Sequence, residues 1–190
     1  MKKHPSSLSA SPKRMICAAM CLALCQLLPF LTGQIPEIGG MLCPMHIPVL
    51  LAGFVCGPWW ALVVGFIAPL LRFALFQMPP LFPTGIAMCF ELAVYGLVSG
   101  FVFSKLPKKP VSVYIALISA MLSGRLIWGA VRVLLTFTGR SPFSWSLFMT
   151  GAFTTAIPGI ILHIILIPVL VFALQKAGII EQKQTTNKVI

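Results

Sequence analysis

The feature that most constrains this chain is a succession of apolar runs, several of them long enough to cross a lipid bilayer. A transmembrane helix needs about 20 largely apolar residues, and the run Val111–Phe137 exceeds that length. Only 9% of the 190 residues are charged, whereas charged residues make up about a quarter of a soluble domain. The sequence therefore predicts an all-α integral membrane protein with no room for a separate soluble domain.

The basic residues indicate which side of the membrane the ends of the chain face. Most of the Lys and Arg residues lie before the first apolar run, in the loop 105–109, or after residue 175. Cytoplasmic segments of membrane proteins carry an excess of Lys and Arg, so we expect these three segments in the cytoplasm. This placement also argues that the net charge of +11 does not serve a nucleic-acid partner.

Two termini on one side of the membrane require an even number of spans. The stretch Met41–Leu71 could form one long tilted helix, which would give five spans, or two shorter helices broken at Gly57-Pro58, which would give six. The charge pattern favours a compact bundle of six transmembrane helices. It would occupy residues 14–175, between a basic cytoplasmic tail at 1–13 and a second cytoplasmic tail at 176–190. The expected spans are about 15–31, 44–56, 59–76, 83–103, 111–137 and 148–174, and the loops 32–44, 77–82 and 138–147 would face outside.

Arg125 lies near the middle of an otherwise apolar run. A cation there costs about 3 kcal/mol on insertion scales, so such a residue usually faces a cavity, a partner or a substrate. Arg132 follows two helical turns later on the same face, with Trp128 between them. The three residues predict a polar, aromatic-lined stripe that holds a polar small molecule within the membrane.

Glu91 is expected at a similar depth to Arg125, in the outer half of the preceding antiparallel span. An ion pair between them is physically reasonable because an unpaired charge at that depth would be very costly. The pair could lock two helices together, or one or both side chains could bind a ligand. Tyr95, one turn from Glu91, could support the carboxylate through a hydrogen bond.

Further candidate side chains lie around this pair. Arg72 and Arg140 lie nearer the outer rim, where a surplus of arginine suggests a carboxylate-bearing ligand, although both could also snorkel to headgroups. His46, near the outer start of the second span, and His163, near mid-membrane, could contact a ligand or bond to a neighbouring helix. The six cysteines lie almost entirely in apolar runs without CxxC or Cys/His ligand spacing, so we expect no metal and no other cofactor.

Ala19 and Ala23 lie one turn apart near the cytoplasmic end of the first span. Small residues at this spacing make a flat face on which another helix can pack closely. The pattern is common in membrane helices, but its position suggests a partner subunit.

These features together resemble the substrate-binding S component of energy-coupling factor (ECF) transporters. The segments 41–51, 78–84 and 91–96 are similar to the vitamin-type branch, and the resemblance covers about residues 12–175. It implies a bacterial cytoplasmic membrane protein that captures a vitamin outside and docks on a transmembrane T subunit. Two cytoplasmic ATPases would power uptake, while the S component topples in the membrane to release its ligand.

The resemblance also assigns roles to residues. Ala19 and Ala23 would match the AxxxA docking motif of the family. The binding pocket would lie among the outer ends of helices four to six, where Glu91, Arg125 and the Trp128–Arg132 stripe are expected, with the first outer loop as a lid. Pantothenate-type members are the most similar, while folate, pyridoxine-type and queuosine-precursor substrates stay open.

Two other classes of function agree less well with the sequence. An intramembrane enzyme could use Glu91, Arg125 and His163, but the chain has only three acidic residues and no serine–histidine, HExxH or paired-carboxylate pattern. A self-sufficient secondary carrier would need an internal repeat and a second intramembrane acid, which the sequence lacks. The chain also contains no GxxxxGK[ST] phosphate loop. We therefore expect a non-catalytic subunit whose partners hydrolyse ATP.

Overall fold

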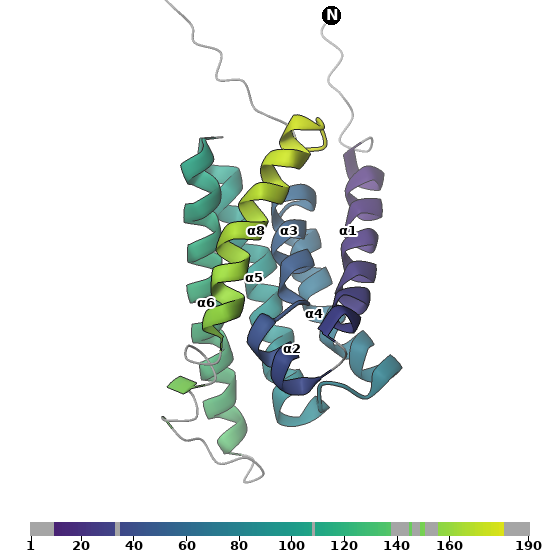
Figure 1. Ribbon diagram of the computed structural model, residues 1–190, viewed down its shortest axis with the longest axis vertical. Coiled ribbons are helices and arrows are strands. Elements are labelled where there is room, and N and C mark those ends of the chain that lie inside the picture. Colours follow the sequence, from purple (N-terminus) through teal and green to yellow (C-terminus); the bar gives the residue numbers. More distant parts are fainter. Residues whose placement is uncertain are drawn as a thin grey trace, which may run out of the picture.

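The computed structural model describes residues 10–32, 35–107, 109–137, 145, 149–150 and 156–180, and in this part of the chain all regular structure is helical (Figure 1). In chain order the elements are α1 (Ala10–Leu27), η1 (Leu28–Thr32), α2 (Pro36–Leu42), α3 (His46–Cys56), α4 (Pro58–Phe76), η2 (Leu81–Gly85), α5 (Ile86–Lys105), α6 (Pro110–Thr136) and α8 (Ile157–Lys176). The predicted all-α class is confirmed for these residues.

Five helical segments among the described residues are long and apolar enough to cross a membrane. They are Pro12–Leu31, Pro58–Phe76, Leu81–Lys105, Pro110–Thr136 and Ile157–Lys176. The apolar helix α3 has only 11 residues, which is about 16 Å of helix and about half the thickness of a hydrocarbon core. The chain is therefore a multi-pass membrane protein with one shorter helix inside its bundle.

The break between α3 and α4 falls at the predicted place. Gly57 has a φ of 91°, a conformation that a residue without a Cβ adopts readily. Pro58 then occupies the first turn of α4, where its missing N–H removes no helical hydrogen bond. Met41–Leu71 thus contains separate helices rather than one long one.

The structure differs from the expected boundaries in two places. The segment 32–44 contains the short helix α2, because Pro36 suits a first helical turn. Cys43, with a φ of 48°, ends α2 by donating its N–H to the Gly39 carbonyl at 2.9 Å. The last long helix begins at Ile157 rather than near residue 148, since Pro158 takes its first turn. Residues 151–155, which precede it, lie outside the described part.

Helix α5 lies between α4 and α6 and packs along both of them, and α3 is almost wholly buried beside it. Small residues allow the backbones to approach closely. Gly96 of α5 lies against the backbone of Ala61, and Gly65 of α4 lies against the backbone of Leu92, with no space for a Cβ at either glycine. Close packing through small residues is typical of membrane helix interfaces, where apolar side chains gain little by leaving lipid.

The far end of α1 is held to α4 by a group that we call the Arg72 clamp, consisting of Gln26, Phe30, Arg72 and Phe76. Arg72 is only 4% exposed and donates from Nη1 to the Gln26 carbonyl at 2.9 Å. Its guanidinium carbon lies 5.6 Å and 5.0 Å from the ring centroids of Phe30 and Phe76. A cation at the last carbonyls of a helix complements the helix dipole. Arg72 therefore does not snorkel but caps α1.

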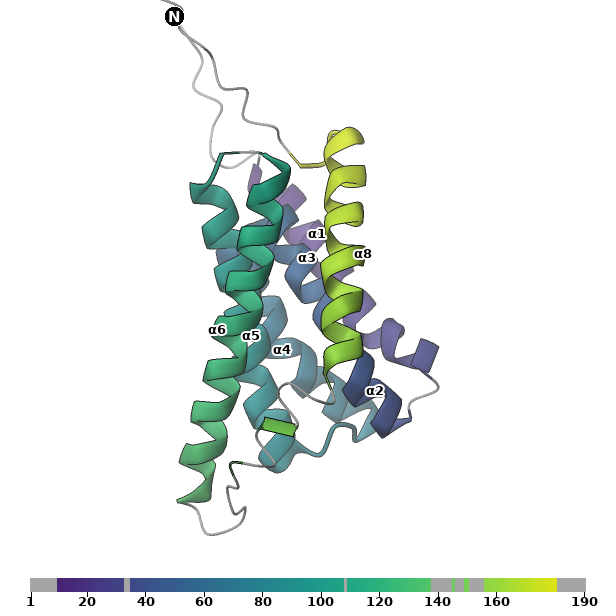
Figure 2. The ribbon, with the colours of Figure 1, turned by 60° about the vertical axis from the view of Figure 1, so that its left-hand side comes forward.

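The directions of the helices place several chain segments at one end of the bundle. Helix α1 begins and α8 ends at the same end (Figures 1 and 2). The connection between α5 and α6 lies at this end as well (Figure 2). The start of α3 and the end of α6 lie toward the other half, which holds the candidate site.

Candidate functional site

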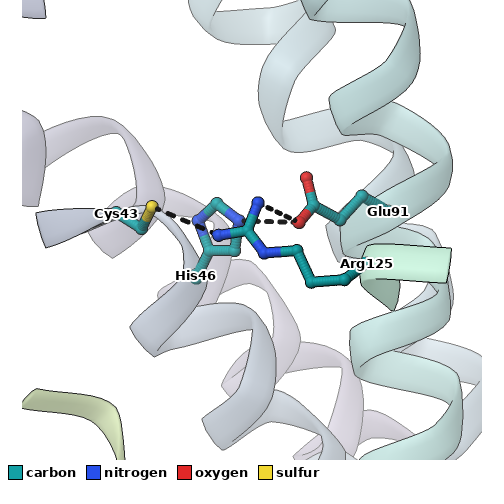
Figure 3. A network of polar contacts seen from close by, with 4 residues as sticks. All are labelled: Cys43, His46, Glu91 and Arg125. Carbon is teal, nitrogen blue, oxygen red and sulfur yellow. Dashed lines mark hydrogen bonds and ion pairs between the residues drawn. The ribbon is translucent and has the colours of Figure 1, made fainter. Parts of the chain in front are cut away.

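Glu91 and Arg125 form the ion pair that their predicted depths indicated (Figure 3). Glu91 Oε1 lies 2.9 Å from Arg125 Nη1, and the two side chains are 1% and 13% exposed. Glu91 comes from α5 and Arg125 from α6. The opposite charges compensate each other where an isolated charge would be very costly.

His46, the first residue of α3, lies near the same carboxylate oxygen as Arg125 (Figure 3). Its Nε2 is 3.7 Å from Glu91 Oε1, and its side chain is also buried. The His46 ring packs edge-on against Tyr95, with ring centroids 5.2 Å apart, and stacks on His163 of α8 at 6.1 Å. His46 thus joins three elements around Glu91, and both histidines that the sequence singled out belong to one cluster.

Cys43 is a member of this group that the sequence reasoning missed, since the cysteines were considered only as metal ligands. Arg125 donates from Nη2 to Cys43 Sγ at 3.9 Å (Figure 3). The Cys43 carbonyl accepts the His46 backbone N–H at 3.0 Å, and the Cys43 backbone also interacts with His163. The left-handed turn at Cys43 brings it over the ion pair. Its place one turn before His46 was the only signal in the sequence.

Tyr95 lies one turn from Glu91 on α5, and the two side chains interact. Its ring lies directly against Gly124 of α6, so that a Cβ at Gly124 would overlap ring carbons of Tyr95. Gly124 immediately precedes Arg125. The small residue therefore lets the tyrosine occupy the space beside the ion pair.

We call the residues described so far the Glu91 cluster: Cys43, His46, Glu91, Tyr95, Arg125 and His163. Within the described structure, five of its buried polar atoms have no hydrogen-bond partner, namely His46 Nδ1 and Nε2, Glu91 Oε1, Arg125 Nε and His163 Nε2. Glu91 Oε1 nevertheless lies 2.9 Å from Arg125 Nη1 and 3.7 Å from His46 Nε2, as described above. Buried polar atoms are nearly always hydrogen-bonded, so a concentration of exceptions marks a site suited to a polar ligand.

Trp128 and Arg132 form a second group farther along α6. The Arg132 guanidinium carbon lies 5.8 Å from the centroid of the Trp128 ring, within the range of a cation–π contact. Both side chains are half-buried. They share a helix face with Arg125, but they lie nearer the end of α6.

Ala19 and Ala23 lie on an exposed face of α1, while Cys21 and Cys25 on another face are buried. Met20 and Leu27 are exposed as well. This side of α1 is thus apolar and contains small residues. Arg140, the remaining rim residue that the sequence suggested, lies outside the described residues.

Among the described residues no group of three or more His, Cys, Asp or Glu side chains could hold a metal ion. In the Glu91 cluster, Arg125 contacts both the Glu91 carboxylate and the Cys43 thiol. The arrangement is therefore suited to hydrogen bonding and charge recognition.

Comparison with known proteins gives one match. The model of the family described as "ECF transporter, substrate-specific component" matches residues 13–171. No curated protein and no solved structure matches the chain significantly. The matched segment includes all five long apolar segments except Pro12 and the last residues of α8, and it includes the Glu91 cluster. The chain therefore belongs to the family of substrate-specific components of ECF transporters.

Proposed function

We propose that this protein captures a vitamin or vitamin precursor outside the cell and delivers it inward together with an ATP-driven module. Pantothenate, or another carboxylate-bearing vitamin, is the substrate that we favour. The observation that carries the proposal is the Glu91 cluster, in which five buried polar atoms lack a hydrogen-bond partner among the described residues. In a substrate-specific component, a ligand is the natural partner for such atoms.

We further propose six membrane passes, with both termini in the cytoplasm of a bacterial cell. The common end of α1, α8 and the α5–α6 connection supports an even number of passes (Figure 2). Lys105 and Lys176 end α5 and α8, in agreement with the positive-inside rule. In this orientation the short helix α3 counts as one pass, and its first residue, His46, faces the outer half.

The partners would be a transmembrane T subunit and two cytoplasmic ATPases. The exposed face of α1 around Ala19 and Ala23 supports docking to the T subunit, since small residues allow close approach of a second helix. The absence of a phosphate-binding loop in the sequence agrees with ATP hydrolysis by partners.

Native mass spectrometry of the chain, purified alone in mild detergent from cells grown in rich medium, tests capture directly. The expected result is one bound small molecule of vitamin-like mass, absent from a Glu91→Ala variant that is shown to be folded. Protein that is empty and also ignores a panel of added vitamins would contradict the proposal.

The docking role needs a separate experiment. Replacing Ala19 and Ala23 together by Leu should abolish uptake in cells and co-purification of the T subunit, yet leave ligand binding unchanged. Replacing the exposed Met20 by Leu provides a control with little change in side-chain volume on the same helix. Loss of ligand binding in the double variant would contradict a docking role.

A further inference from the structure

We propose that the site recognises an elongated ligand in two separate parts, an uncharged hydroxyl- or amide-bearing end in the Glu91 cluster and a carboxylate at Arg132. This inference rests on the proposed capture function. It assigns different parts of the ligand to two arginines on one helix face, Arg125 and Arg132. It follows because Glu91 already neutralises the guanidinium of Arg125, whereas Arg132 contacts no carboxylate among the described residues.

Arg125 is unsuited to a ligand anion because its charge is already matched. Glu91 lies 2.9 Å away, and both side chains are largely buried. A second carboxylate beside Arg125 would also lie beside the carboxylate of Glu91, and like charges at such a distance repel strongly where water is excluded. The deep end of the site thus presents no net charge to a ligand.

The buried atoms of the Glu91 cluster that lack a hydrogen-bond partner include both donors and acceptors, so a ligand there needs both functions. Glu91 Oε1 can only accept a hydrogen bond, and Arg125 Nε can only donate one. Each histidine ring offers one donor and one acceptor when neutral. Neither nitrogen of His46 has a hydrogen-bond partner among the described residues, although Nε2 lies 3.7 Å from Glu91 Oε1. Hydroxyl and amide groups supply both functions, whereas a carboxylate supplies acceptors alone.

Arg132, unlike Arg125, is suited to binding a ligand carboxylate. Within the described part of the chain its guanidinium contacts the face of Trp128 and no carboxylate. Stacking on an aromatic ring leaves the guanidinium edge, with its N–H donors, available for bidentate binding of a carboxylate. Its half-buried position also reduces the cost of removing the ligand anion from water.

The spacing between the two arginines sets the length of the ligand. Seven residues of helix rise by about 10 Å, and Arg125 and Arg132 lie on one face of α6. A ligand that reaches both would carry its carboxylate about 10 Å from its hydroxyl or amide groups. A compact acid could satisfy one end only.

Pantothenate and panthenol are matched probes, because panthenol carries a primary alcohol in place of the carboxylate and is otherwise the same molecule. Binding of each to the purified full chain would be measured by titration calorimetry. Wild-type protein should bind pantothenate about tenfold to 100-fold more tightly than panthenol, as expected for one charge-assisted contact. Arg132→Gln should bind the two compounds equally, whereas His46→Ala should weaken both by a similar factor. Arg72→Met, outside the site, should behave as wild type.

Equal binding of the two compounds by wild type, or discrimination that persists in Arg132→Gln, would overturn the two-part assignment while capture itself stands. A captured molecule without a carboxylate, identified by mass, would do the same. If wild type bound neither probe and carried no molecule from cells, both the assignment and the proposed function would be overturned.

Discussion

Arg72 and Arg125 are both buried cations in this bundle, but their surroundings differ in kind. Arg72 is held by a backbone carbonyl and two phenylalanine rings, and in the Arg72 clamp only Gln26 Oε1 lacks a partner in the described structure. Arg125 is held by a carboxylate and a thiol, in a cluster where five buried polar atoms have no hydrogen-bond partner among the described residues. The first arrangement joins two helices, whereas the second retains unused hydrogen-bonding capacity. Burial of an arginine is therefore common to both groups, and the proposed binding site differs from the clamp in its unsatisfied neighbours.

The largest effect is expected from breaking the ion pair. Glu91→Ala leaves Arg125 buried without its counter-charge, which should lower the stability by about 3–5 kcal/mol. Thermal unfolding in mild detergent would measure the loss. The double variant Glu91→Gln/Arg125→Met removes both charges and should recover most of the stability without recovering ligand binding. A loss below about 1 kcal/mol in Glu91→Ala would contradict the importance of the pair.

A smaller effect is expected at the contact between α5 and α6. Gly124→Ala places a methyl group against the Tyr95 ring, which should cost about 1–3 kcal/mol and weaken ligand binding by displacing the ring from Glu91. Ala130→Val, on an exposed part of α6, is the control for added volume. Unchanged binding in a stable Gly124→Ala protein would show that the position of Tyr95 does not matter.

The Arg72 clamp should respond differently from the Glu91 cluster. Arg72→Met keeps apolar contact with the phenylalanine rings but leaves the Gln26 carbonyl without its donor, for a loss of about 1–3 kcal/mol. Affinity for the captured ligand should stay within about threefold of wild type, less than 1 kcal/mol. A loss of affinity as large as that of Arg125→Ala would erase the distinction between the two arginines. Unfolding and titration on the same preparation supply both values.

The smallest effect is expected from one ring of the Arg72 clamp. Phe76→Leu removes a cation–π contact and the edge-on contact with Phe30, whose ring centroid is 5.1 Å away. The expected loss of stability is about 0.5–1 kcal/mol, with no change in ligand affinity. Loss of more than about 3 kcal/mol would place Phe76 in the packed core instead of at the edge of the bundle.

Parts of this molecule could be predicted from the sequence because membrane physics restricts them strongly. The ion pair between Glu91 and Arg125 followed from helical rise along two consecutive apolar runs, because the charges had to be compensated. The break at Gly57-Pro58 followed from backbone chemistry. Each of these inferences used only residues within one helix or two consecutive helices.

Other parts depended on contacts between distant segments and could not be predicted. The left-handed turn at Cys43 brings a thiol to Arg125, although cysteine has no preference for that conformation. Arg72 reaches the Gln26 carbonyl only because the end of α1 packs on α4. The sequence shows a cation within an apolar run in both cases, and the tertiary fold decides which groups surround that cation.

The ion pair joins two helices that follow each other in the chain, and this has a consequence for biosynthesis. Arg125 entering lipid by itself would cost about 3 kcal/mol, but the α5–α6 hairpin brings Glu91 with it. The hairpin can leave the insertion machinery with the Arg125 charge already compensated, before α8 has been synthesised. Variants that break the pair are then expected to fail first during insertion, as α5–α6 hairpins retained at the translocation channel.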